Sequence, residues 1–173
     1  DAGGGVYFCG VAPVRPERRG ELWRLDAQTG AFDCVEPATD GMPNGMGLSP
    51  DGRTFYFVVS DERRIYAYDF DPVAKRPSGR RVLCSDFPGG GVPDGMCVDP
   101  ADGTLWVAVW GGSRLEHRAA DGRLLSSTPF RAEKVSSATV AGGVIYVTTA
   151  NLPFDPAAFA ERGAGCVFAL RKD

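Results

Sequence analysis

The chain has 173 residues, of which 43% are hydrophobic and 24% charged, the composition of one ordinary globular domain. Its net charge is −3, its pI is near 5.2 and it has no basic stripe, so we expect neither nucleic acid nor a membrane surface as a partner. The longest apolar runs, such as residues 105–110, are far shorter than the roughly 18 residues of a membrane span.

Four short runs along the chain have the same character, with an aromatic residue second among apolar or β-branched neighbours. They are VYFC at 6–9, FYFV at 55–58, LWVA at 105–108 and IYVT at 145–148. A second set follows them, with LWRL at 22–25, IYAY at 65–68, RLEH at 114–117 and VFAL at 167–170. Such runs predict β-strands, most of them with one buried face.

Turn dipeptides separate the predicted strands. Asp-Gly occurs at 51–52, 102–103 and 121–122, and Gly-Gly at 142–143. The one segment that suggests a turn of helix is residues 156–162. The fold class is therefore expected to be all-β.

The runs recur at intervals of 40 to 50 residues, which indicates a β-propeller of four-stranded blades. A two-sheet sandwich is the alternative, and it explains the strands and turns but not the correspondence between whole units. At roughly 40–50 residues per blade the chain makes about four blades. It begins within a repeat, at Asp1 and without an initiator methionine. We therefore expect residues 1–173 to form a single propeller domain that is an N-terminally incomplete ring.

Several familiar sites are excluded by the residue types. His117 is the only histidine, so a multi-histidine zinc site and an H-E-x-x-H motif are impossible within the chain. His117 lies in a strand-like run and is interpreted as a structural or surface residue. The glycine runs at 3–5 and 89–91 lack the spacing of a phosphate-binding loop. Any metal here is expected to have oxygen ligands.

Two related motifs offer such ligands: PNGMGLS at 43–49 and PDGMCVD at 93–99. Asn44 supplies an amide oxygen and Asp94 a carboxylate, which suit a hard cation such as calcium, magnesium or manganese. Each sits just before a predicted innermost strand, so both could point at the propeller axis. The alternative is that each motif is only a tight turn followed by packing residues.

The same residues resemble the gluconolactonase–regucalcin family of sugar lactone hydrolases. The likeness rests on PNGMGLSPDG at 43–52 followed by YAYD at 66–69, and on PDGMCVD at 93–99 followed by GTLWVA at 103–108. IYVTTA at 145–150 and GCVF at 165–168 are similar to the last blade of that family. The resemblance runs through essentially the whole chain and covers the C-terminal two-thirds of a family member.

The resemblance implies a six-bladed ring with one divalent cation (Ca, Zn, Mg or Mn) at its axis, and a small-molecule sugar lactone as substrate. It implies that Asn44 and Asp94 ligate the metal and that Asp94 is also the catalytic acid/base. The family's third ligand and its sugar-contacting arginine and asparagine would lie upstream of Asp1. The alternative is a non-catalytic propeller that binds calcium or a protein partner.

The chain also departs from the family pattern. Residues 11–15 read VAPVR where many relatives carry Thr-Met, which leaves the identity of the lactone open. Asn151 and Phe154 either line the mouth of the pocket or are ordinary loop residues. The five cysteines are an odd number and form no C-x-x-C pair. We therefore expect free, mostly buried thiols and a cytoplasmic location.

Overall fold

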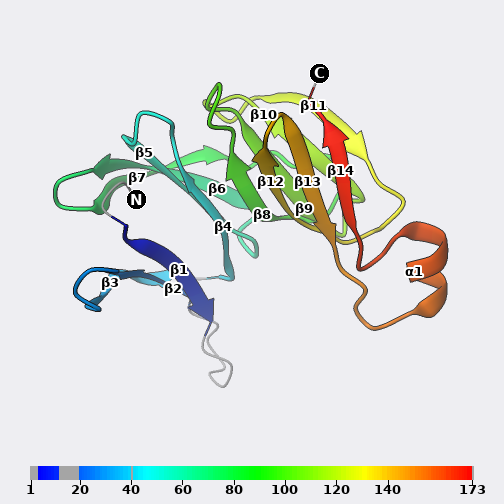
Figure 1. Ribbon diagram of the computed structural model, residues 1–173, viewed down its shortest axis with the longest axis horizontal. Coiled ribbons are helices and arrows are strands. Elements are labelled where there is room, and N and C mark those ends of the chain that lie inside the picture. Colours follow the sequence, from blue (N-terminus) through cyan, green and yellow to red (C-terminus); the bar gives the residue numbers. More distant parts are fainter. Residues whose placement is uncertain (1–3, 12–19, 40, 173) are drawn as a thin grey trace.

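The computed structural model describes residues 4–11, 20–39 and 41–172. Four antiparallel sheets follow one another along the chain and are arranged side by side like the blades of a fan (Figure 1). In the second and third sheets each strand pairs with the next strand in sequence, which is the up-and-down order of a propeller blade. The all-β propeller prediction is confirmed.

The first sheet contains β1 (Val6–Val11), β2 (Gly20–Leu25) and β3 (Phe32–Thr39). The second contains β4 (Pro43–Leu48), β5 (Thr54–Val59), β6 (Arg64–Asp71) and β7 (Arg76–Cys84). The third contains β8 (Val92–Val98), β9 (Leu105–Trp110), β10 (Arg114–Arg118) and β11 (Leu124–Pro129). The fourth contains β12 (Val135–Ala141), β13 (Val144–Thr149) and β14 (Val167–Arg171), with helix α1 (Pro156–Arg162) before β14.

The two sets of similar runs occupy equivalent places in the sheets. The first set lies in β1, β5, β9 and β13, and the second in β2, β6, β10 and β14, each paired with its partner from the first set. In the described residues, the second and third sheets have four strands and the other two have three. The predicted repeat is therefore a structural repeat.

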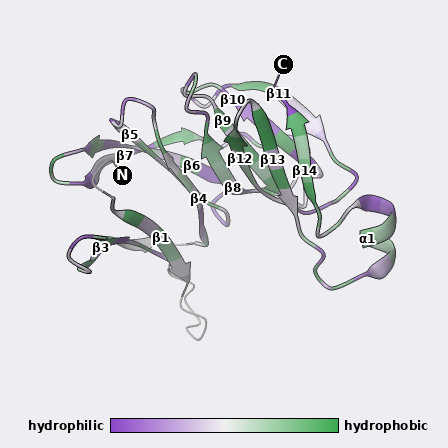
Figure 2. Ribbon diagram, in the orientation of Figure 1, coloured by the Kyte–Doolittle hydropathy of each residue, from purple (hydrophilic) through white to green (hydrophobic). Residues whose placement is uncertain are grey.

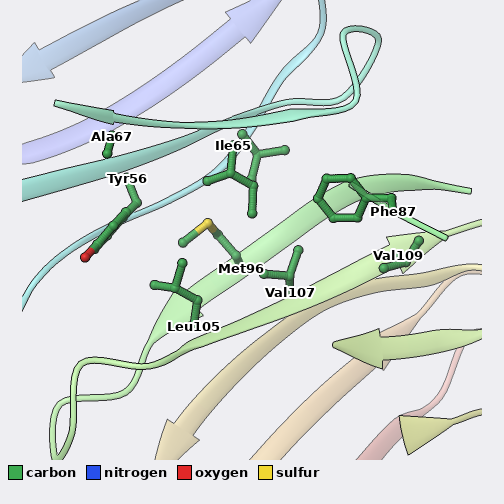
Figure 3. Packing of buried hydrophobic residues seen from close by; sticks show 9 residues of the cluster. Tyr56, Ile65, Ala67, Phe87, Met96, Leu105, Val107 and Val109 are labelled. Carbon is green, nitrogen blue, oxygen red and sulfur yellow. The ribbon is translucent and has the colours of Figure 1, made fainter. Parts of the chain in front are cut away.

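A separate hydrophobic core lies between each pair of successive sheets. Phe55 and Phe57 of β5 point into the core shared with the first sheet, whereas Tyr56 and Val58 point into the core shared with the third. Figure 3 shows the latter core, and the strands carry most of the hydrophobic colour in Figure 2. A sheet of a two-layer sandwich buries one face, so the burial of both faces rules out the sandwich.

Helix α1 spans the predicted residues, and its ends follow the usual capping rules. The Asp155 side chain accepts a hydrogen bond of 2.9 Å from Ala157 N, Pro156 occupies the first turn, and Gly163 ends the helix with φ 68°. None of the described helical residues belongs to a segment long and apolar enough to cross a membrane.

No disulfide joins the five cysteines in the described residues, in line with the prediction, but none of their side chains is fully buried. Each is partly exposed. The reason is their position, because Cys9, Cys84 and Cys97 pack at the margins of the three cores and not at their centres. The cytoplasmic location stays a prediction.

Candidate functional site

The two P-[ND]-G motifs lie on the innermost strands of the second and third sheets. Strands β4, β8 and β12 contact one another in that order, and Figure 1 shows β4 and β8 side by side in the middle of the molecule. The sequence interpretation placed Asn44 and Asp94 just before these strands. The structure corrects this, because β4 begins at Pro43 and β8 at Val92, so that both residues lie inside a strand.

Each motif forms a β-bulge, and the two bulges are equivalent. Asn44-Gly45 is inserted where the register of β4 shifts between Pro43 and Met46. Asp94-Gly95 is inserted at the corresponding place in β8. A bulge adds one residue to a strand and redirects its side chains, and bulges are enriched next to active sites.

The turn interpretation of these dipeptides is therefore wrong, whereas it is right for the Asp-Gly pairs that follow them. Gly52 and Gly103 have φ values of 65° and 74° and lie in the loops that join each innermost strand to the next one. Gly45 and Gly95 are not in the left-handed region. Glycine is required at these two positions because neighbouring strands approach the backbone too closely to leave room for a side chain.

A side chain at Gly45 would have no room beside β8. A Cβ there would lie 2.4 Å from Met96 N and 2.7 Å from Asp94 O. Gly95 approaches the next inner strand in the same way, because its Cβ would lie 2.4 Å from Ser137 Oγ. The two glycines therefore let three inner strands touch, and this brings side chains from different blades together.

Ser60, at the end of β5, links the two motifs. Its hydroxyl accepts a hydrogen bond of 3.2 Å from Asn44 Nδ2 and donates one of 2.7 Å to the carbonyl oxygen of Pro93. Ser60 is buried, with 4% of its surface exposed. The Cys9 thiol also donates to the Asn44 backbone carbonyl, with 3.6 Å between Sγ and O. Asn44 is thus held by groups of the first and second sheets, and Ser60 links it to the third.

Burial raises the pKa of the Asp94 carboxyl from 3.8 to about 6, while hydrogen bonds from the Asn44 side chain and the Gly95 backbone oppose that rise. The Asn44 side chain therefore lies close enough to Asp94 to influence its pKa. The described part of the chain gives Asp94 no cationic partner. A buried carboxyl with a pKa near neutrality can exchange protons at physiological pH, which is what a general acid or base requires.

The chemistry of these two residues fits a hard divalent cation. Among residues 4–11, 20–39 and 41–172, no group donates a hydrogen bond to Asn44 Oδ1. An amide oxygen and a carboxylate without a counter-charge are ligands that Ca²⁺, Mg²⁺ and Mn²⁺ accept. The same described residues contain no group of three or more His, Cys, Asp or Glu that could hold a metal, so a cation here would need ligands besides Asn44 and Asp94.

The sequence analysis missed Ser60 and a third bulge. Strand β12 shifts register between Val135 and Ser137, which makes Ser136 the counterpart of Asn44 and Asp94 in the fourth sheet. The hydroxyl of Ser136 lies 2.9 Å from Thr148 Oγ1. Ser60 could have been found from its position in the sequence. It directly follows the second strand of a blade, at the end of the sheet where Pro43 lies.

The lone histidine has a structural role, as predicted. Its ring stacks on that of Trp106 with 3.9 Å between centroids, and its Nε2 lies 2.9 Å from Thr104 Oγ1. Thr104 Oγ1 donates its hydrogen to Asp102 at 2.6 Å, so His117 must donate to Thr104. His117 therefore cannot act as a base toward this hydroxyl.

The loop before α1 contains Asn151 and Phe154, and its contacts favour the interpretation that they are ordinary loop residues. The Asn151 side chain donates to Asp155 O and accepts from Asp155 N, both at 2.9 Å, so it shapes its own loop. It also lines a small cavity together with Lys134 and Leu152. Phe154 is 75% exposed. Residues 11–15 depart from the family pattern, and all of them except residue 11 lie outside the described part of the chain.

Comparisons with known proteins identify the family. The model of the SMP-30/gluconolactonase/LRE-like region matches residues 1–151. Pentonolactonase XacC of Haloferax volcanii is 37% identical over 150 residues, which are 85% of this chain and 50% of that protein. Regucalcin of Danio rerio is 34% identical over 132 residues, which are 73% of this chain and 44% of that protein.

A solved structure shows the same fold. Regucalcin from Agrobacterium tumefaciens, described as a calcium-binding protein, superposes with a TM-score of 0.83 at 22% identity, over 97% of this chain and 57% of that one. The chain spans about half the length of the curated relatives described above. The match to the family model covers most of the chain. The chain belongs to the SMP-30/gluconolactonase/LRE-like family.

Proposed function

We propose that this chain supplies the centre of a metal-dependent hydrolase of sugar lactones, with Asp94 as acid/base and Asn44 and Asp94 as ligands of one divalent cation. The observation that carries the proposal is the meeting of these two side chains at equivalent bulges of adjacent inner strands, with the pKa of Asp94 raised to about 6. The family likeness supports the substrate class, because one relative is named a pentonolactonase.

Lactone hydrolysis adds water to the ring carbonyl and breaks the bond between the carbonyl carbon and the ring oxygen. When bound, a divalent cation would polarise the carbonyl and lower the pKa of water. The ionised Asp94 carboxylate takes a proton from the attacking water and later gives it to the ring oxygen as that oxygen leaves. Asn44 orients the centre, and its hydrogen bond helps to keep Asp94 ionised before the reaction begins.

Burial of Asp94 suits this role. A fully solvated carboxyl with a pKa near 4 is a weak base, whereas one with a pKa of about 6 is a stronger base that is still largely ionised at pH 7. The identity of the lactone and of the cation is left open by these residues, since oxygen ligands accept Ca²⁺, Mg²⁺ and Mn²⁺, and Zn²⁺ also accepts carboxylate.

The test is a pH-stat assay of aldonolactone hydrolysis by the full-length protein, with each of the four cations and with EDTA. We expect Asp94→Asn to abolish turnover while cooperative unfolding is retained. Asp51→Asn, in an exposed turn, is the matched control and should leave turnover unchanged. Hydrolysis by Asp94→Asn at a rate near that of the wild type would refute the mechanism. Cation binding without acid release would instead favour a non-catalytic calcium-binding propeller.

A further inference from the structure

The hydroxyl of Ser60 lies between the Asn44 side chain and the backbone of β8. It lies 3.2 Å from Asn44 Nδ2 and 2.7 Å from Pro93 O. Ser60 is 4% exposed, so neither contact is easily replaced by water. What this hydroxyl can donate and accept determines how the Asn44 amide must be oriented.

A serine hydroxyl carries one hydrogen, and the Pro93 carbonyl oxygen can only accept. At 2.7 Å, that single hydrogen is committed to Pro93. Toward Asn44 the hydroxyl oxygen can therefore only accept, so the amide must turn its NH₂ group to Ser60. The opposite orientation would place two acceptors, Asn44 Oδ1 and Ser60 Oγ, against each other.

The oxygen and nitrogen of an asparagine amide have nearly the same shape, so the donor and acceptor roles of Ser60 decide which of them faces its hydroxyl. With Nδ2 on Ser60, Oδ1 is the end of the amide that receives no hydrogen bond from the described residues. We infer that Ser60 is a positioning residue, which presents Asn44 Oδ1 to the cation by holding Nδ2. The cation in this inference rests on the proposed function, whereas the orientation of the amide does not.

The neighbouring blade shows that the hydroxyl is not needed merely to join blades. The position equivalent to Ser60 in the third sheet is Trp110, since Ser60 and Trp110 each follow the residue paired with the motif's proline. Trp110 is joined to the next blade by a backbone bridge to Lys134. In the second sheet, where Asn44 must be oriented, the equivalent position carries the Ser60 hydroxyl.

The experiment measures Ca²⁺ binding to the full-length protein by isothermal titration calorimetry. We expect Ser60→Ala to raise the Kd by about 10- to 100-fold, the usual effect of losing a group that orients a metal ligand. In an Asn44→Asp background the same change should raise the Kd by no more than about twofold, as for independent sites. The reason is that a carboxylate presents an oxygen in either orientation.

Thr149→Val is the matched control for loss of a buried hydroxyl. Thr149 is 7% exposed, and its Oγ1 donates to Gly163 O at 2.7 Å, two blades away from Asn44. This variant should lower Tm without changing the Kd for Ca²⁺. An unchanged Kd for Ser60→Ala would overturn the inference, and so would an equal rise in Kd in both backgrounds, because that would mean that Ser60 only supports the backbone.

A second measurement needs neither a cation nor a variant. In the ¹⁵N-labelled wild-type protein with EDTA, nuclear Overhauser effects should connect the Asn44 side-chain NH₂ with the Ser60 β-protons. Their absence would overturn the inferred orientation, even if Ser60→Ala fails to fold. If the effects are present but the protein binds none of the four cations and hydrolyses no lactone, the orientation stands and the proposed function fails.

Discussion

Replacing Asp94 by asparagine should make the metal-free protein more stable while it removes activity. The side chain is largely buried, and burial is the main reason that its pKa rises from 3.8 to about 6. An asparagine of nearly the same size has no charge to bury and can still accept the hydrogen bond from Asn44. The change therefore removes an unfavourable charge and keeps the packing.

The magnitude follows from the pKa. An increase of about 2 in pKa corresponds to about 3 kcal/mol at about 1.4 kcal/mol per unit, and partial exposure of the side chain reduces this to about 2 kcal/mol. The raised pKa means that the folded state binds a proton more tightly than the unfolded state. Wild-type stability should therefore fall as pH rises from about 4 to about 6, and the gain from Asp94→Asn should be complete above that range and absent below it.

The assay is urea unfolding of the full-length protein in EDTA at pH 8 and at pH 3.5, with activity measured in parallel. Asp51→Asn is the control with the opposite sign, because hydrogen bonds from Ser49 and the Arg53 backbone lower the pKa of Asp51. Saturating Ca²⁺ should then stabilise the wild type, by about 2.7 kcal/mol at 100 times the Kd, and leave Asp94→Asn unaffected. If the wild type and Asp94→Asn were equally stable at pH 8, burial of the Asp94 charge would not be unfavourable and the reasoning would be refuted.

Four further substitutions, one of them a control, test the supporting structure. Gly45→Ala places a Cβ 2.4 Å from a backbone nitrogen of β8, so urea unfolding should show a loss of about 1–3 kcal/mol. Gly10→Ala, which meets nothing within 4 Å, should stay within about 0.5 kcal/mol of the wild type. Glu116→Gln breaks a fully buried ion pair to arginines on either side along β10 and should cost about 3–5 kcal/mol in the same assay. Lys172→Met removes the ammonium group that lies 2.8 Å from the Asp102 carboxylate. Burial raises the pKa of the Asp102 carboxyl, but its hydrogen bonds outweigh that effect and lower the pKa to about 2. The hydrogen bond from Lys172 contributes most to this lowering. The resulting loss of stability should be present above pH 4 and disappear as pH falls toward 2, as followed by thermal melts across pH. A loss that grows as the pH falls would contradict this last expectation.

The blade architecture could be predicted because propeller strands repeat both in pattern and in position. In β5, residues Phe55 and Phe57 face one core while Tyr56 and Val58 face the other, so the run is apolar throughout. A run of this kind, repeated every 40 to 50 residues with an Asp-Gly or Gly-Gly turn before each of its later copies, leaves few other folds. Local pattern and global fold agree here, which is why the prediction succeeded.

The bulges could not be predicted from the same pattern. Asn-Gly and Asp-Gly are strong turn signals. Gly45 differs from a turn glycine such as Gly52 in its backbone conformation and in the approach of a neighbouring strand, and the dipeptide encodes neither. Ser60 was missed for a similar reason, since its two partners lie 16 and 33 residues away in sequence. Pairings between blades depend on how sheets pack, and a single sequence does not carry that information.

The placement of the site on the contact between blades makes its chemistry depend on blade packing. Met96, next to the Asp94 bulge, packs into the core between the second and third sheets, where Figure 3 shows it beside Ile65 and Tyr56. The spacing of these two sheets therefore sets the distance between Asn44 on β4 and Asp94 on β8. Because the two residues belong to different blades, neither blade could form the pair alone. A change that loosens this core should then impair the centre before it unfolds either sheet.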